Sequence, residues 1–151
     1  MLDVEQFRKI VIVPALRMTK TYSQAAEELL LGTALQESRL TYLKQLGTGP
    51  AVGVFQMEPA THNDIWANFL AYNPVLAKAV GKLTHRPTAQ SMATDLLYAA
   101  AMCRVHYLRV KEKLPAEGDI YGQAEYWKQY YNTHLGSGTA KEYMHAWEAH
   151  S

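Results

Sequence analysis

One segment near the N-terminus constrains the fold more than any other part of the sequence. Between residues 21 and 38, alanines and leucines recur at three- and four-residue spacing. This spacing predicts an α-helix with one buried stripe. Thr21 and Gln24 match a capping box, which places the start of the helix at residue 21. Glu37 continues the stripe and is therefore expected to point where core residues point.

The rest of the sequence is mostly helical in pattern. The run GTGPAVGVFQMEP at residues 47–59 differs, because its glycines, prolines and short alternation predict a turn and a brief strand or hairpin. We expect an α+β fold, mostly α, with a small β hairpin or sheet after the 21–38 helix. About 100–200 residues is the usual size of a domain, so residues 1–151 are expected to form one domain. Further helices are predicted over residues 4–19, with a break or new first turn at Pro14, and over 61–72, 89–113, 123–131 and 139–150.

Charge and cysteine content exclude several classes of protein. The 15 basic and 14 acidic residues give a formal net charge of +1, so no global field attracts nucleic acid or an anionic membrane. Cys103 is the single cysteine, which excludes an internal disulfide, and its apolar neighbours predict a buried thiol. The apolar run 10–16 is short and contains Pro14, so we expect neither a signal peptide nor membrane insertion, and a chain that stays in the cytoplasm where it is made.

Glu37 has two interpretations from its position alone. A glutamate at a helix end can extend into solvent, or pair with Arg39 or Lys44. Alternatively, partial burial destabilises the charged form, raises the pKa of the carboxyl group and makes it a proton donor near neutral pH. The position of Glu37 does not choose between these two interpretations.

The residues that follow Glu37 resemble the lysozyme-like domain of soluble lytic transglycosylases. In that family a helix ends in Glu-Ser and precedes a run of glycines, a glutamine, a proline and a threonine. Here Glu37 and Ser38 precede GPAVGVFQMEPAT at residues 49–61. Two further family elements have counterparts in the same order, AAMCRVHYL at residues 100–108 and QYYNTHLGSG at residues 129–138.

This resemblance implies a peptidoglycan glycosidase. The bond cleaved would be the β-1,4 bond between N-acetylmuramic acid and N-acetylglucosamine, with Glu37 as the general acid and no cofactor. It also implies substrate-binding roles for Ser38, Gln56, Tyr131 and Asn132, although a glycine of the family pattern after Asn132 is missing here. Ser38 has the alternative role of a polar residue at a helix end. The implied partners are peptidoglycan glycan strands.

Glu58 and His62 bear on the type of cleavage. Goose-type lysozymes, which are related, place a carboxylate two residues after the glutamine and a histidine four residues further, and Glu58 and His62 stand at these offsets from Gln56. A second catalytic carboxylate can activate water, whereas a lone acid leaves a 1,6-anhydro product. The run EPAT follows the transglycosylase pattern, and Glu58 is alternatively an exposed turn residue. The sequence leaves muramidase and transglycosylase open.

Aromatic residues and histidines outside these motifs are less informative. Trp66 and Trp127 are the first candidates for faces that stack on sugar rings, with a place in the core as the alternative. The remaining histidines have no zinc-ligand spacing, so no metal is predicted.

The sequence is also compatible with two functions other than catalysis. The chain is alternatively a catalytically inactive relative that binds wall sugars or forms part of a virion, or a helical interaction module, which leaves residues 47–59 unexplained. A small wall hydrolase without a signal peptide suggests a bacteriophage protein. It would reach the wall as an endolysin released with a holin, or as a virion-associated enzyme with other virion components as partners.

Overall fold

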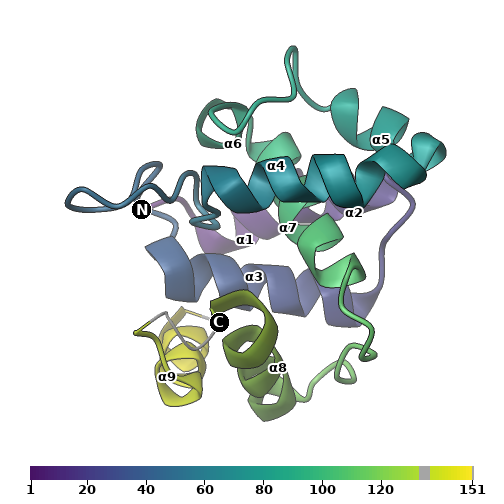
Figure 1. Cartoon of the computed structure of the whole chain (residues 1–151). Helices are drawn as coiled ribbons and strands as arrows, with labels where there is room; N and C mark the ends of the chain where they lie inside the picture. Colours follow the sequence, from purple (N-terminus) through teal and green to yellow (C-terminus); the bar gives the residue numbers. More distant parts are fainter. Residues whose placement is uncertain (133–136, 151) are drawn as a thin grey trace.

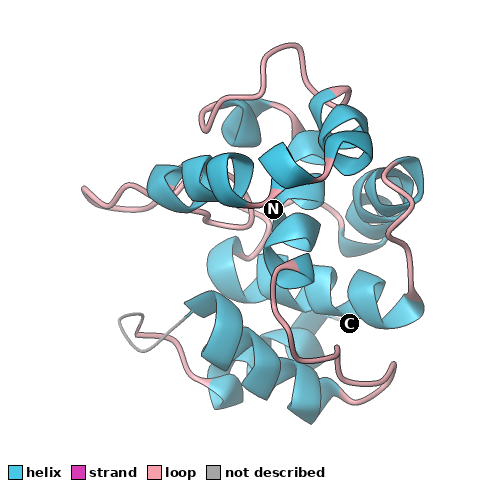
Figure 2. Ribbon diagram, turned by 45° about the vertical axis from the view of Figure 1, so that its right-hand side comes forward, coloured by secondary structure: helices cyan, strands magenta, loops and turns pink. Residues whose placement is uncertain are grey.

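The computed structural model describes residues 1–132 and 137–150. Helices joined by loops make up this part of the chain (Figure 2). None of the helices described is long and apolar enough to cross a membrane. In chain order the elements are α1 (Val4–Gln6), the π-helical segment η1 (Phe7–Ile12), α2 (Val13–Met18), α3 (Gln24–Ser38), α4 (Pro59–Asn68), the 3-10 turn η2 (Leu70–Tyr72), α5 (Pro74–Gly81), α6 (Ser91–Thr94), α7 (Leu96–Leu108), α8 (Ile120–Trp127), the π-helical segment η3 (Lys128–Asn132) and α9 (Ala140–His150).

Helix α3 crosses the centre of the molecule (Figure 1). It contacts α8 and α9, which lie below it in this view, and also η1 and α7. Every residue from 26 to 35 is buried. The sequence predicts a single buried stripe, but α3 is covered all round, as expected of a helix in the middle of a core.

Two carboxylates on the first half of α3 are buried with partners. Glu28 accepts hydrogen bonds from the Gly118 backbone N–H (2.7 Å) and from Gln123 Nε2 (2.9 Å). Glu27 accepts a hydrogen bond from the Tyr22 hydroxyl (2.6 Å) and pairs with Arg8. Charged groups are tolerated in a core only with such partners. These contacts tie α3 to the helices on both sides of it.

The two ends of α3 are fixed by the backbone. Ser23, rather than Thr21, is the N-cap residue, because its hydroxyl accepts a hydrogen bond from the Ala26 N–H (3.0 Å). The predicted capping box is therefore wrong. Arg39 and Leu40 adopt the left-handed conformation, with φ of 53° and 54°, which ends the helix directly after Glu37 and Ser38.

The predicted β hairpin or sheet, and with it the α+β class, is wrong. Within residues 1–132 and 137–150 no strand forms, and Lys44–Val52 and Val52–Met57 are isolated antiparallel bridges. The run VGVFQM folds instead as a tight turn, in which the Gln56 N–H donates to the Gly53 carbonyl (3.0 Å). Gly53 and Gln56 have positive φ of 80° and 49°, which a strand does not allow. The fold is mostly helical, with a folded loop between α3 and α4.

The apolar residues of this loop are core residues, as predicted. Val54, Phe55 and Met57 are all buried. The loop therefore carries part of the core although it contains no strand. Burial alone does not distinguish a strand from a turn, which is why the sequence pattern misled.

The predicted helices are otherwise largely present, with local differences. Pro14 lies in the first turn of α2, directly after π-helical η1, where its missing N–H is tolerated. Helix α5 is not predicted, although it begins with Pro74 and proline is common at the first position of a helix. The predicted 89–113 helix is divided at Asp95, which has an extended backbone.

The packing of α9 on α3 depends on Gly32. A Cβ atom at this position would lie 1.9 Å from the hydroxyl oxygen of Tyr143, which is fully buried. We expect Gly32→Ala to lower the free energy of unfolding by about 1–3 kcal/mol, as overpacking does. Urea unfolding measures this. The matched control is Gly81→Ala at the end of α5, where the nearest atom is 3.9 Å from the added Cβ, and an equal loss there would contradict the account.

Candidate functional site

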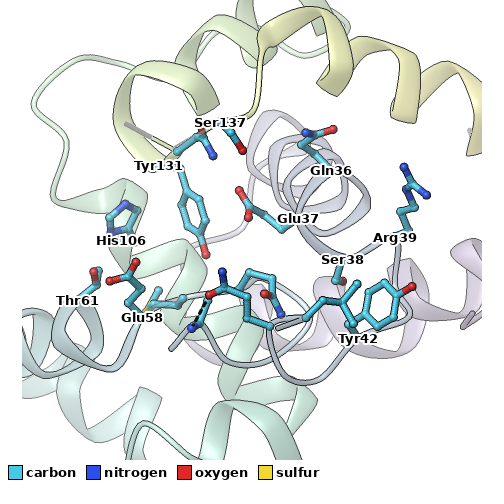
Figure 3. Close-up of a pocket in the computed structure, with 16 residues that line it drawn as sticks. Gln36, Glu37, Ser38, Arg39, Tyr42, Glu58, Thr61, His106, Tyr131 and Ser137 are labelled. Atoms are coloured by element: carbon cyan, nitrogen blue, oxygen red, sulfur yellow. Dashed lines mark hydrogen bonds between the residues drawn. The ribbon is translucent and has the colours of Figure 1, made fainter. Parts of the chain in front are cut away.

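A cleft of about 910 Å³ lies where the end of α3, the loop after it and η3 meet. This volume is in the range of ligand-binding sites. In Figure 3 the Glu37 side chain points into the cleft from the end of α3, with Tyr131 and Ser137 on one side and Glu58 and Thr61 on another. Uncharged polar side chains supply much of the lining, namely Gln36, Tyr42, Gln45, Gln56, Thr61 and Asn132.

Glu37 is a partly buried acid with two hydrogen-bond donors. Trp127 Nε1 donates to Glu37 Oε2 (2.9 Å), and the Asn132 side chain also bonds the carboxyl group. Burial raises the pKa of Glu37 from its ordinary value of 4.5 to about 7, although both hydrogen bonds lower it. The carboxyl group thus turns toward α8 and η3. Near neutral pH it can both donate and accept a proton.

The donors come from the end of α8 and from η3. Trp127 is fully buried, and its ring packs on Tyr143 at 5.5 Å between centroids. Asn132 Oδ1 accepts a hydrogen bond from Lys128 Nζ (2.9 Å), which leaves the amide nitrogen to face Glu37. The acid is therefore held by side chains far from it in the sequence.

Ser38 and Tyr131 dock the loop at the cleft. The Ser38 hydroxyl donates to the Val54 carbonyl (2.7 Å), and the Tyr131 hydroxyl donates to the Phe55 carbonyl (2.6 Å). Two consecutive carbonyls of the tight turn thus accept hydrogen bonds, one from a residue of α3 and the other from a residue of η3. Both residues line the cleft, and these hydrogen bonds go to the loop backbone. Their predicted contacts with substrate stay predictions.

Gln56 and Glu58 also lie at the cleft. Gln56 Nε2 donates to the Gly53 carbonyl (2.9 Å), so this side chain folds back on its own turn. Glu58 precedes α4, is exposed, and makes no side-chain capping bond with the helix. The structure brings Glu37, Ser38, Gln56, Glu58, Tyr131 and Asn132 to one cleft.

His62 is the predicted site residue that the structure does not bring to the cleft lining. It is buried between α4 and α7, with Nε2 bonded to the Tyr98 hydroxyl (2.6 Å) and Nδ1 bonded to Asn63 (2.9 Å). Trp66 Nε1 donates to the same Tyr98 oxygen (2.9 Å). His62 therefore joins a polar network inside the helical packing.

Sequence reasoning missed His106 at the cleft and the contact of Trp127 with Glu37. Trp127 is a candidate for a sugar-stacking face or for the core, and it is fully buried and donates its indole N–H to Glu37. His106 lines the cleft, and its Nδ1 must accept from Arg109 Nη2 (3.3 Å), because a guanidinium only donates. His106 Nε2 then donates to the Tyr130 carbonyl (3.0 Å). Burial lowers the pKa of His106 to about 4 and keeps it neutral.

Neither the place of His106 nor the bond from Trp127 to Glu37 had a signal strong enough to be found from sequence. Trp127 is ninety positions from Glu37 in the chain, and an indole that faces a carboxylate has no spacing pattern. His106 lies within the AAMCRVHYL run and three residues before Arg109, which is one helical turn. That spacing was available but does not by itself indicate a cleft.

The comparisons with known proteins give no relative. No family model, no curated protein and no solved structure matches this chain. Among the described residues, no three side chains of His, Cys, Asp or Glu gather where they could share a metal ion. The geometry of Glu37 and its cleft is therefore the feature of this structure that bears on function.

The raised pKa of Glu37 predicts a pH-dependent stability. Between pH 4.5 and about 7 the folded chain holds a proton at Glu37 that the unfolded chain releases, so this group contributes less stability as the pH rises. Glu37→Gln removes the effect. We expect the unfolding free energy of Glu37→Gln, relative to wild type, to increase by roughly 1–3 kcal/mol from pH 4 to pH 8. Urea unfolding at several pH values measures it, and a constant difference would contradict the assignment.

Proposed function

We propose that this chain cleaves peptidoglycan glycan strands at the β-1,4 bond between N-acetylmuramic acid and N-acetylglucosamine, with Glu37 as acid and base. The observation that carries the proposal is a partly buried carboxyl group, with a pKa of about 7, that points into a polar cleft. Glycosidic cleavage needs an acid that is protonated near neutral pH. The substrate class comes from the motif resemblance around Glu37 and residues 49–61.

The lining of the cleft fits a glycan. Amide and hydroxyl side chains can both donate and accept hydrogen bonds, which suits the hydroxyl and acetamido groups of sugars. In the first step the Glu37 proton passes to the bridging oxygen. The bond from that oxygen to C1 of the muramic acid breaks, and positive charge develops at C1. Glu37 is left as a carboxylate.

The second step distinguishes a transglycosylase from a hydrolase. Glu58 is exposed and no side-chain bond fixes it to α4, so it is poorly held for activating a water. This favours the route with one acid. The Glu37 carboxylate takes the proton of the C6 hydroxyl of the same sugar, O6 bonds to C1, and a 1,6-anhydro end forms without consuming water. We therefore favour a lytic transglycosylase, with a muramidase that uses Glu58 as the second candidate.

Digestion of purified peptidoglycan tests the role of Glu37. General acid–base catalysis contributes about 10²–10⁴-fold, so we expect Glu37→Gln to lose at least about 100-fold in rate while it stays folded. Soluble fragments released over time measure the rate. Full activity of Glu37→Gln would overturn the mechanism. Wild type that sediments with peptidoglycan and releases nothing would support the inactive wall-binding alternative.

Product masses test the role of Glu58. The one-acid route predicts 1,6-anhydro muramic ends, which are 18 mass units lighter than reducing ends because water is not added. It also predicts that Glu58→Gln keeps most of the wild-type rate. Reducing ends, together with a large loss of rate in Glu58→Gln, would instead support the muramidase.

A further inference from the structure

The indole of Trp127 joins α8 to the end of α3 through a single polar contact. Its Nε1 donates to Glu37 Oε2 (2.9 Å). We propose that Trp127 is a positioning residue, whose N–H fixes the Glu37 carboxyl group in the orientation from which it meets the substrate. The inference rests on the proposed role of Glu37 as the acid. It adds a residue that none of the sequence motifs includes.

Packing holds the Trp127 ring in one place. The ring is fully buried and lies against Tyr143 from α9. Its other edge is close to the backbone, since a Cβ added to Gly138 would lie 2.6 Å from Trp127 Cη2. A donor fixed in this way needs no reorganisation during the reaction. A buried indole N–H also requires an acceptor, and Glu37 is that acceptor.

Trp127 and Asn132 both bond Glu37, but only Asn132 lies at the cleft. Asn132 lines the cleft, is partly exposed and can also face a substrate. Trp127 does not line the cleft and is fully buried, so it acts only through Glu37. This separation makes Trp127 the cleaner test of positioning. A substitution there changes the acid without removing a substrate contact.

The N–H of Trp127 favours the charged form of Glu37, since a donor stabilises a carboxylate more than a neutral carboxyl group. It therefore opposes the effect of burial on the pKa of Glu37, and its removal should raise that pKa further. The other titratable or charged groups around the acid are Cys103 and Tyr107 on α7, Tyr131 on η3, and His106, Arg39 and Glu58 at the cleft, with Lys128 behind Asn132. Burial keeps the pKa of Cys103, Tyr107 and Tyr131 well above their ordinary values, and that of His106 at about 4.

The test compares Trp127→Phe with Trp66→Phe. Both variants remove one indole N–H and keep an aromatic ring, but Trp66 donates to Tyr98 and lies outside the cleft lining. The carboxyl carbon of Glu37 is titrated by NMR with ¹³C-labelled glutamate, assigned with Glu37→Gln. We expect Trp127→Phe to raise the pKa of Glu37 by about 1 pH unit, as the loss of a charge-assisted hydrogen bond would. Trp66→Phe should leave it unchanged, and no rise, or an equal rise in both variants, would overturn the proposal.

The pH dependence of activity is the second measurement. Cleavage needs protonated Glu37, so the rate falls as the pH rises through the pKa of Glu37. This limb should move to higher pH in Trp127→Phe by the same interval as the titration. If wild type cleaves no glycan, the proposed function fails, yet the NMR titration still tests whether Trp127 fixes the acid.

A second variant tests the proposal if Trp127→Phe does not fold. Gly138→Ala keeps the indole but displaces it, because the added Cβ lies 2.6 Å from Trp127 Cη2. We expect a rise of the Glu37 pKa in the same direction, though smaller. An unchanged pKa in folded Gly138→Ala, with unfolding of Trp127→Phe, would assign Trp127 a purely structural role and overturn the proposal.

Discussion

The burial of α3 on all sides determines where the candidate acid can lie. Residues 26–35 are enclosed by helices from both ends of the chain. The Glu27 carboxylate pairs with Arg8 on η1, and the Glu28 carboxylate accepts a hydrogen bond from Gln123 on α8. The enclosure ends where Arg39 and Leu40 turn the backbone away in the left-handed conformation. Glu37 stands at this boundary, so its side chain is partly desolvated but still reaches an open cleft.

The same boundary brings together parts of the chain that are distant in sequence. The turn after Gly53 is held by the hydroxyls of Ser38 and Tyr131 on consecutive carbonyls. Trp127 and Asn132 hold Glu37 from α8 and η3. One wall of the cleft is thus a loop with a folded turn, and the opposite wall is a π-helical segment. The protonation state of Glu37 results from desolvation on one side and donated hydrogen bonds on the other.

Most of the helices were predictable from the sequence, because helical periodicity is a local signal. Helices α3 and α9 lie within the predicted ranges 21–38 and 139–150, although α3 is buried on all sides rather than along one stripe. The class of the 47–59 segment was not predictable, since alternating apolar residues are buried equally well in a strand and in a tight turn. The N-cap at Ser23 rather than Thr21 depends on backbone geometry that spacing does not encode.

The residues of the motif resemblance account for most of the predicted residues that line the cleft. Glu37, Ser38, Gln56 and Glu58 line one cleft. Tyr131 and Asn132, which are distant in sequence and were predicted from the motif resemblance, line it as well. His62 lies on α4 outside the cleft lining, where its side chain bonds the Tyr98 hydroxyl. Trp127 and His106 enter through tertiary packing, which no spacing rule describes.

The central claim is that a glycan strand lies in this cleft with its scissile oxygen at Glu37. A crystal structure of the Glu37→Gln variant with a bound peptidoglycan fragment tests it most directly. The account predicts that the bridging oxygen between N-acetylmuramic acid and N-acetylglucosamine lies within about 2.6–3.2 Å of the side-chain amide at position 37. A fragment bound elsewhere on the molecule, or with its glycosidic oxygens out of reach of position 37, would contradict it.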